Sequence, residues 1–137
     1  MHLRTTMEVD VPLIRRWMEA DPEHSLEKRN SPEFLLTGNG LLAFCLADDK
    51  GPLAFMRLDA DGEMVRASIQ FGPPDEVSKR RMTVGLMRLG FPAIVKFAQN
   101  NKYVGIVFES VNASLIGFLE SRYKICKATG DDYTLVF

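Results

Sequence analysis

The sequence predicts a single α/β (α+β) domain, spanning residues 1–137, in which helices cover a mixed, mostly antiparallel β-sheet. The chain has 137 residues, of which 46% are hydrophobic and 26% are charged, and this composition is globular. Three apolar runs of strand length follow one another in the middle of the chain, separated by short polar turns. A long helical pattern then leads into another buried strand, and this order predicts a strand–helix–strand crossover.

The first part of the chain predicts one strand and two helices. Residues 1–6 are short and mixed in character, and we expect them to form the first strand. Asp10 is expected to cap a helix, and Pro12 fits its first turn because the missing N–H costs nothing there. Trp17 lies on the apolar face of this helix. A second, short helix is expected over 31–38, where Ser and Pro precede the apolar residues and Gly follows them.

The middle of the chain predicts an antiparallel meander. The three apolar runs occupy 41–48, 52–59 and 64–71. The turns between them contain Asp and Gly, which are the residue types that tight turns between antiparallel strands favour.

The last part of the chain predicts two more helices and three more strands. A helix from about residue 81 to residue 100 has a broad apolar face, and Gly90 and Pro92 inside it predict a kink. The complete order is β-α-α-β-β-β-α-β-α-β-β. The elements after the long helix are a strand at 103–108, a helix at 112–121, and strands at 123–128 and 132–137 around a turn at Thr129, Gly130 and Asp131.

The formal net charge of -1 conceals an uneven distribution of charge. Between positions 77 and 108 there are six cations and no acidic residue, so this stretch is +6 and the other 11 basic and 18 acidic residues give -7. Such a distribution favours a localised anionic partner over a long polyanion. The six cations are Lys79, Arg80, Arg81, Arg88, Lys96 and Lys102.

Cysteines, histidines and hydropathy exclude several classes of protein. Cys45 and Cys126 each lie in an apolar run, which predicts two reduced core thiols, with a disulfide as the weaker alternative. Two dispersed cysteines with His2 and His24 do not supply a metal site. The sequence has neither a secretory signal nor a long apolar stretch, so we expect a soluble, cytoplasmic protein with no membrane association.

Residues 77–85, between the third strand of the meander and the long helix, form the candidate binding segment. The start of a helix offers free N–H groups and the positive end of the helix dipole, and both favour phosphate or pyrophosphate. Neither GxxxxGK[ST] nor GxGxxG is present. One alternative is a solvated basic turn that only precedes the helix. However, the cations Lys79, Arg80 and Arg81 oppose the helix dipole there, and this favours a site at which an anion is normally bound.

The order of elements and this segment together resemble the GNAT superfamily of acetyl-coenzyme A dependent N-acetyltransferases. That family carries (Gln/Arg)-x-x-Gly-x-(Gly/Ala) between its fourth strand and third helix, where backbone amides hold the pyrophosphate of coenzyme A. Arg80 and Gly85 match the first and last positions, and Thr83 replaces the middle glycine. The family also has an Asn after its fifth strand that contacts the pantetheine arm, and Asn112 stands in that place. The resemblance spans essentially the whole chain.

The resemblance implies an N-acyltransferase that moves an acetyl group from acetyl-CoA to an amine and uses no metal. It implies that residues 70–72 pair through their backbone with pantetheine and that residues 80–85 hold the pyrophosphate. The cofactor-binding residues that it implies are Gln70, Phe71, Gly72, Lys79, Arg80, Arg81, Met82, Thr83, Val84, Gly85 and Asn112.

Departures from the family pattern leave the catalytic groups open. The family often places a Tyr seven residues after the Asn as a general acid, but this chain has Leu119 there and its nearest tyrosine is Tyr123. The strand at 64–71 has no carboxylate, whereas Glu63 and Glu109 lie at strand ends and could act as a base through water. Glu109 and Tyr123 are the catalytic candidates. Their alternatives are a solvated charge and a packed aromatic ring.

Two other functions remain open from the sequence. A GNAT-like fold that has lost catalysis and binds a protein partner would explain the missing tyrosine, the missing strand carboxylate and Thr83. Nucleic-acid binding is less favoured, because the chain as a whole is not basic. Acidic residues in 19–27 and 130–132 favour a cationic amine as the acyl acceptor. Similar proteins often dimerise, so a homodimer is a further partner to test.

Overall fold

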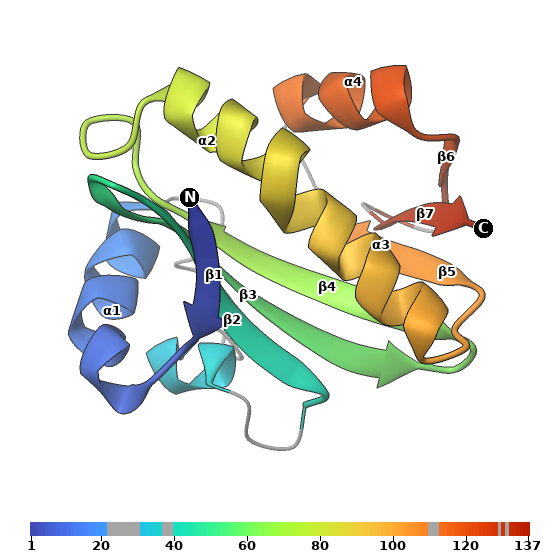
Figure 1. Ribbon diagram of the computed structural model, residues 1–137, viewed down its shortest axis with the longest axis horizontal. Coiled ribbons are helices and arrows are strands. Elements are labelled where there is room, and N and C mark those ends of the chain that lie inside the picture. Colours follow the sequence, from blue (N-terminus) through green and yellow to red (C-terminus); the bar gives the residue numbers. More distant parts are fainter. Residues whose placement is uncertain (22–30, 37–39, 110–112, 129, 131) are drawn as a thin grey trace.

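Within the described residues, seven strands form one sheet in the order β1-β2-β3-β4-β5-β7-β6, with helices on both faces (Figure 1). The computed structural model describes residues 1–21, 31–36, 40–109, 113–128, 130 and 132–137. The strands are β1 (His2–Thr5), β2 (Leu42–Asp48), β3 (Gly51–Asp61), β4 (Met64–Phe71), β5 (Gly105–Glu109), β6 (Ile125–Lys127) and β7 (Asp132–Val136). The helices are η1 (Glu8–Asp10), α1 (Val11–Ala20), η2 (Pro32–Leu35), α2 (Lys79–Gly85), η3 (Leu86–Gly90), α3 (Phe91–Asn100) and α4 (Ala113–Arg122).

The sheet is mixed and mostly antiparallel, as the sequence predicts. Strands β1 to β4 pair in order as antiparallel neighbours, so the predicted meander is confirmed. Among the strands of the described residues, only β4 and β5 pair in parallel, through the crossover formed by α2, η3 and α3. Strand β7 then lies antiparallel between β5 and β6.

A long helical run made of α2, η3 and α3 crosses one face of the sheet, with α4 beside it (Figure 1). Two glycines let this run approach the strands. A Cβ at Gly85 would lie 2.8 Å from Leu53 Cδ1, and one at Gly90 would lie 3.1 Å from Met56 Cε. Phe91 is buried at the start of α3 and contacts Phe108 of β5 edge to face. The core on this face therefore depends on a close helix–sheet approach.

Helices α1 and η2 pack against the opposite face. Trp17 of α1 is buried, and its ring centroid lies 5.4 Å from that of Phe55 on β3. Arg57, two residues further along β3, places its guanidinium 4.4 Å from the ring centroid of Phe34 in η2 and donates to the Phe34 carbonyl oxygen at 2.8 Å. The two short helices are thus attached to the same strand by an aromatic contact and a charged one.

Several predicted local features differ from the structure. The long helix begins at Lys79, two residues earlier than expected, so the segment from Lys79 to Gly85 is helical and is not a loop. A π-helical segment, η3, occupies the region of the expected kink. The second helix is a short 3-10 turn, η2. Asp10 does precede α1, but its carboxylate accepts from Arg4 and from the Met7 N–H and makes no hydrogen bond to the helix.

The two cysteines have different environments, so the prediction of two core thiols is wrong for one of them. Both are free. Cys45 is buried in β2, and this burial raises the pKa of its thiol to about 11, which leaves it a weak nucleophile. Cys126 is exposed on the edge strand β6. Over the described residues, no helix has the length and apolar character to cross a membrane, and no three His, Cys, Asp or Glu side chains gather as metal ligands.

Candidate functional site

Strand β4 has an open edge next to the start of the long helical run. Its residues 64–67 pair with β5, whereas all of its residues pair with β3 on the other side. Among the described residues, no strand pairs with residues 68–71 on the β5 side. Backbone N–H and C=O groups at such an edge can bind an extended chain that contains amides.

The first turn of α2 adds anion-binding groups directly after this edge. Ser78 accepts a hydrogen bond from the Arg81 backbone N–H at 3.2 Å, and its carbonyl accepts from the Met82 N–H at 3.0 Å. The side chains of Lys79 and Arg80 are exposed and form no ion pair within the described part of the chain. The first backbone N–H groups of a helix lack intrahelical acceptors and attract anions.

Arg81, the third of the consecutive cations, is already paired. Its guanidinium donates to both carboxylate oxygens of Asp48, at 2.8 Å and 2.7 Å, and both side chains are largely buried. Asp48 lies at the end of β2, so this bidentate pair attaches the start of α2 to the β2–β3 turn. The role of Arg81 that the structure supports is therefore to position the helix.

The Asp48–Arg81 pair predicts an acid-dependent loss of stability. Hydrogen bonds from Arg81 and, next, from the Lys50 backbone N–H lower the pKa of Asp48 from its ordinary value of 3.8 to about 2. The Asp48 carboxylate therefore takes up a proton less readily in the folded protein than in the unfolded chain. The stability that the Asp48–Arg81 pair adds to the folded state is complete above about pH 4 and is lost as the pH falls toward 2. Chemical denaturation at a series of pH values should show that Asp48→Asn weakens this dependence.

The matched control for this prediction is Asp49→Asn, because Asp49 is the exposed neighbour of Asp48. The control should keep the acid-side dependence of the wild type. An Asp48→Asn variant with an unchanged pH profile would contradict the prediction.

The loop between β4 and α2 is also attached to α1. Trp17 donates its indole N–H to Glu76 at 2.6 Å, and Arg16 forms an ion pair with the same carboxylate at 2.7 Å. These contacts lower the pKa of Glu76, with the Arg16 hydrogen bond as the larger cause. Val77 is buried beside Gly72, where a Cβ would lie 2.4 Å from Val77 Cγ2. The loop that precedes the exposed cations therefore has a fixed path.

The other residues of the predicted cofactor site differ in their exposure to solvent, and they range from buried to exposed. Gln70 is only 1% exposed, and its amide donates to Asp21 at 3.3 Å and to the Phe71 carbonyl at 3.0 Å. Thr83 is exposed on α2, whereas Met82 and Val84 are half-buried. Gly85, the glycine that matched the family motif, faces β2 and β3 and allows close packing there. Asn112 lies outside the described residues.

The two predicted catalytic residues lie on opposite faces of the sheet. Phe108 contacts Phe91 on the face of the long helical run, and successive strand residues alternate, so Glu109 projects to the α1 face. Tyr123 follows α4 and packs against Phe91, with 4.8 Å between ring centroids. Leu119, at the position where the family often has its tyrosine, is buried.

An ion network on the α1 face was not predicted. Arg66 of β4 donates to both carboxylate oxygens of Asp132 on β7, at 3.1 Å and 2.9 Å, and to Asp61 at 3.0 Å. These contacts raise the pKa of Arg66, with the Asp132 hydrogen bond as the largest cause. Asp132 was expected to be part of an acidic rim for a cationic acceptor, but its charge is balanced here. Asp131 and residues 22–30 lie outside the described residues.

Comparison with solved structures gives full-length matches at low sequence identity. An acetyltransferase of the GNAT family from Staphylococcus aureus Mu50 has a TM-score of 0.73 at 9% identity, over 98% of both chains. The PaiA N-acetyltransferase of Thermoplasma acidophilum, solved with coenzyme A, has a TM-score of 0.64 at 15% identity, over 98% of this chain and 96% of that one. A GNAT family acetyltransferase from Brucella melitensis, solved with acetyl-CoA, has a TM-score of 0.61 at 17% identity, over 99% of this chain and 87% of that one.

The chain therefore has the fold of the GNAT N-acetyltransferases, and the resemblance drawn from the sequence is confirmed at the level of the fold. No protein-family model and no curated protein matches the sequence.

Proposed function

We propose that the protein is an N-acyltransferase that uses acetyl-CoA. The observation that carries the proposal is the open edge of β4 beside Lys79 and Arg80, which are exposed at the start of α2 and form no ion pair with the residues that the structure describes. The fold adds support, because the similar structures from Thermoplasma acidophilum and Brucella melitensis described above contain coenzyme A and acetyl-CoA, respectively. The edge suits a chain of amides, and the helix start suits a pyrophosphate, so the groups present fit the two parts of coenzyme A.

The protein's part in the reaction is mainly to bind and to position. Backbone groups of residues 68–72 would bind the pantetheine arm, and the N–H groups and side chains of Lys79 and Arg80 would bind the pyrophosphate. Arg81 and Glu76 would act as positioning residues, because each is bound to a neighbouring element. Acetyl-CoA supplies an activated acyl group, so an amine held close to it needs orientation and the removal of one proton.

Glu109 is the proposed acceptor of that proton, acting through water, and Tyr123 is the proposed donor to the departing thiolate. Because these side chains lie on opposite faces of the sheet, the thioester would have to lie in the opening between β4 and β5, between the two faces. Glu109 is exposed at the end of β5, on the face opposite the long helical run. Kinetics with Glu109→Gln should show a fall in kcat of about 100-fold with little change in KM for acetyl-CoA. Tyr123→Phe tests the second role in the same assay, and wild-type rates in both variants would remove both assignments.

Binding of acetyl-CoA is tested directly by thermal shift and calorimetry. At a free concentration about ten times Kd, acetyl-CoA should stabilise the protein by about 1.4 kcal/mol. The double variant Lys79→Glu, Arg80→Glu should weaken binding by about 100-fold, because two attractive charges become repulsive. Lys96→Glu is the matched control, since Lys96 is an exposed cation further along the same helical run, and it should bind as the wild type does. Absence of any shift at millimolar acetyl-CoA would refute the proposal.

A second candidate function is a binding module without catalysis. The specific observation in its favour is Leu119, a buried side chain without a hydroxyl at the position where the family often has its tyrosine. This candidate predicts that acetyl-CoA binds but that no free thiol is released with any amine. Thiol release with polyamines, lysine derivatives or peptide N-termini would exclude it.

A further inference from the structure

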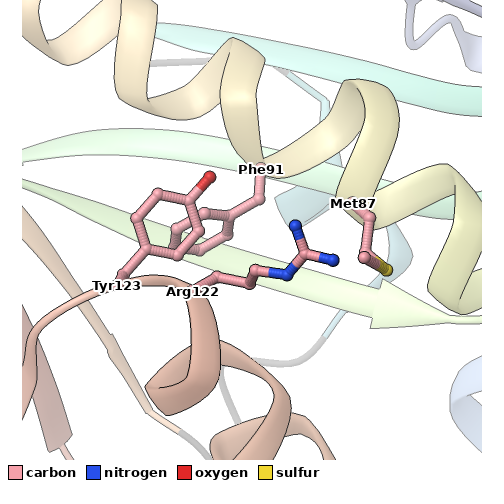
Figure 2. A pocket seen from close by; sticks show the side chains of 4 residues that line it. All are labelled: Met87, Phe91, Arg122 and Tyr123. Atoms are coloured by element: carbon pink, nitrogen blue, oxygen red, sulfur yellow. The ribbon is translucent and has the colours of Figure 1, made fainter.

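A cavity of about 180 Å³ lies between the end of α4 and the long helical run. Met87 of η3 and Phe91 of α3 form one wall, and Arg122 and Tyr123 form the other (Figure 2). Met87 follows Lys79 by eight residues, which is about 12 Å along a helix axis, so the cavity is separate from the proposed pyrophosphate site.

The cavity combines a cation, a hydroxyl and an apolar wall. The guanidinium of Arg122 extends across the cavity toward Met87 (Figure 2). Neither this guanidinium nor the Tyr123 hydroxyl has a hydrogen-bond or ion-pair partner within the part of the chain that the structure describes. The ring of Phe91 is buried and lies against the ring of Tyr123, with 4.8 Å between centroids and 51° between planes. The site therefore combines a guanidinium and a hydroxyl with aromatic surface.

The wall contributed by η3 is an independent reason to expect a ligand here. Residues Leu86–Gly90 are π-helical, and such segments are rare and occur often at functional sites. The stretch 77–108, to which this wall belongs, contains six cations and no acidic residue, and Asp48 pairs with one of the six, Arg81. On α4, the exposed Glu120 is two residues before Arg122 and does not line the cavity.

We propose that this cavity binds a small arylcarboxylate, a ligand of about the size of benzoate. The planar fork of a guanidinium matches a carboxylate through two parallel hydrogen bonds. Phe91, Met87 and the Tyr123 ring contact a planar apolar body. The volume fits, because an apolar cavity of about 150 Å³ holds benzene. Tyr123 is also the proposed proton donor in acetyl transfer, but the test below uses no acetyl-CoA, so its outcome is read separately from the proposed acyltransferase activity.

An NMR titration of the full chain with benzoate tests the proposal. Binding is expected with Kd on the order of 1 mM, and shifts should centre on Met87, Phe91 and Tyr123. Benzamide, which has the same shape without the charge, should bind at least about tenfold more weakly. Arg122→Gln should weaken benzoate binding by a similar factor.

Two cation controls locate the binding site. Lys124→Gln removes an exposed cation two residues beyond Arg122, and Arg80→Gln removes one from the start of α2, and both should leave benzoate affinity unchanged. No saturation at about 10 mM benzoate, equal affinity for benzamide, or an Arg80→Gln effect as large as that of Arg122→Gln would overturn the proposal.

Discussion

Gly105→Ala is expected to destabilise the protein by about 3 kcal/mol or more. Gly105 begins β5 and pairs with Met64 of β4 and Val136 of β7. A Cβ at this position would lie 2.3 Å from the Leu135 carbonyl oxygen and 2.8 Å from Met64 Cε. The first of these atoms belongs to the backbone of a neighbouring strand, so relief requires the sheet itself to move. Urea denaturation followed by circular dichroism measures the loss.

The matched control is Gly117→Ala in α4, where a Cβ would meet nothing within 4 Å. Alanine favours a helix over glycine, so this control should be stabilised by up to about 1 kcal/mol. Equal stability of the two variants would contradict the prediction, because it would mean that a Cβ at position 105 fits between β5 and β7.

Trp17→Ala is expected to cost about 3–5 kcal/mol, the usual range for removing a buried tryptophan. Trp17 is 3% exposed and contacts Phe55 of β3 and the region of Gly72. The same change should also weaken acetyl-CoA binding, because it removes the indole that fixes Glu76 in the loop before α2. Denaturation and calorimetry on the same samples separate the two effects.

Trp17→Phe distinguishes packing from the hydrogen bond to Glu76. Phenylalanine keeps most of the buried aromatic surface and loses only the donor, so its stability should lie much closer to that of the wild type. If Trp17→Phe lost as much stability as Trp17→Ala, the packing explanation would be wrong.

Most elements of the fold could be predicted from the sequence, because apolar periodicity and turn residues lie within the element that they specify. The meander was predicted from apolar runs and Asp- and Gly-containing turns, and β2, β3 and β4 lie where those runs are. The prediction of a helix that ends near residue 100 was also correct. Its predicted start was wrong, because Ser78 caps the helix and α2 therefore begins at Lys79, two residues earlier than expected.

The interactions that shape the candidate site join residues far apart in the sequence, and no local pattern contains them. Arg81 looked like a third phosphate ligand until the structure paired it with Asp48, which is 33 residues earlier. Asp132 looked like an acceptor-binding carboxylate, but Arg66, 66 residues away, balances its charge. Gly85 fitted a phosphate motif, whereas its contacts with Leu46 and Leu53 arise only once the helix has packed on the sheet. Only Lys79 and Arg80 remain available among the three consecutive cations.

The open part of β4 also bears on how the protein avoids aggregation. An exposed strand edge is a template on which another chain can add a strand. In the described part of the chain, β4 lacks a strand partner on the β5 side at residues 68–71 only, and these residues lie inside the strand order, because β5 still pairs with residues 64–67 of the same strand. A second sheet approaching edge to edge would meet one of the outer strands, β1 or β6, first. The arrangement leaves backbone groups available to a single narrow chain while it keeps them away from the edges of other sheets.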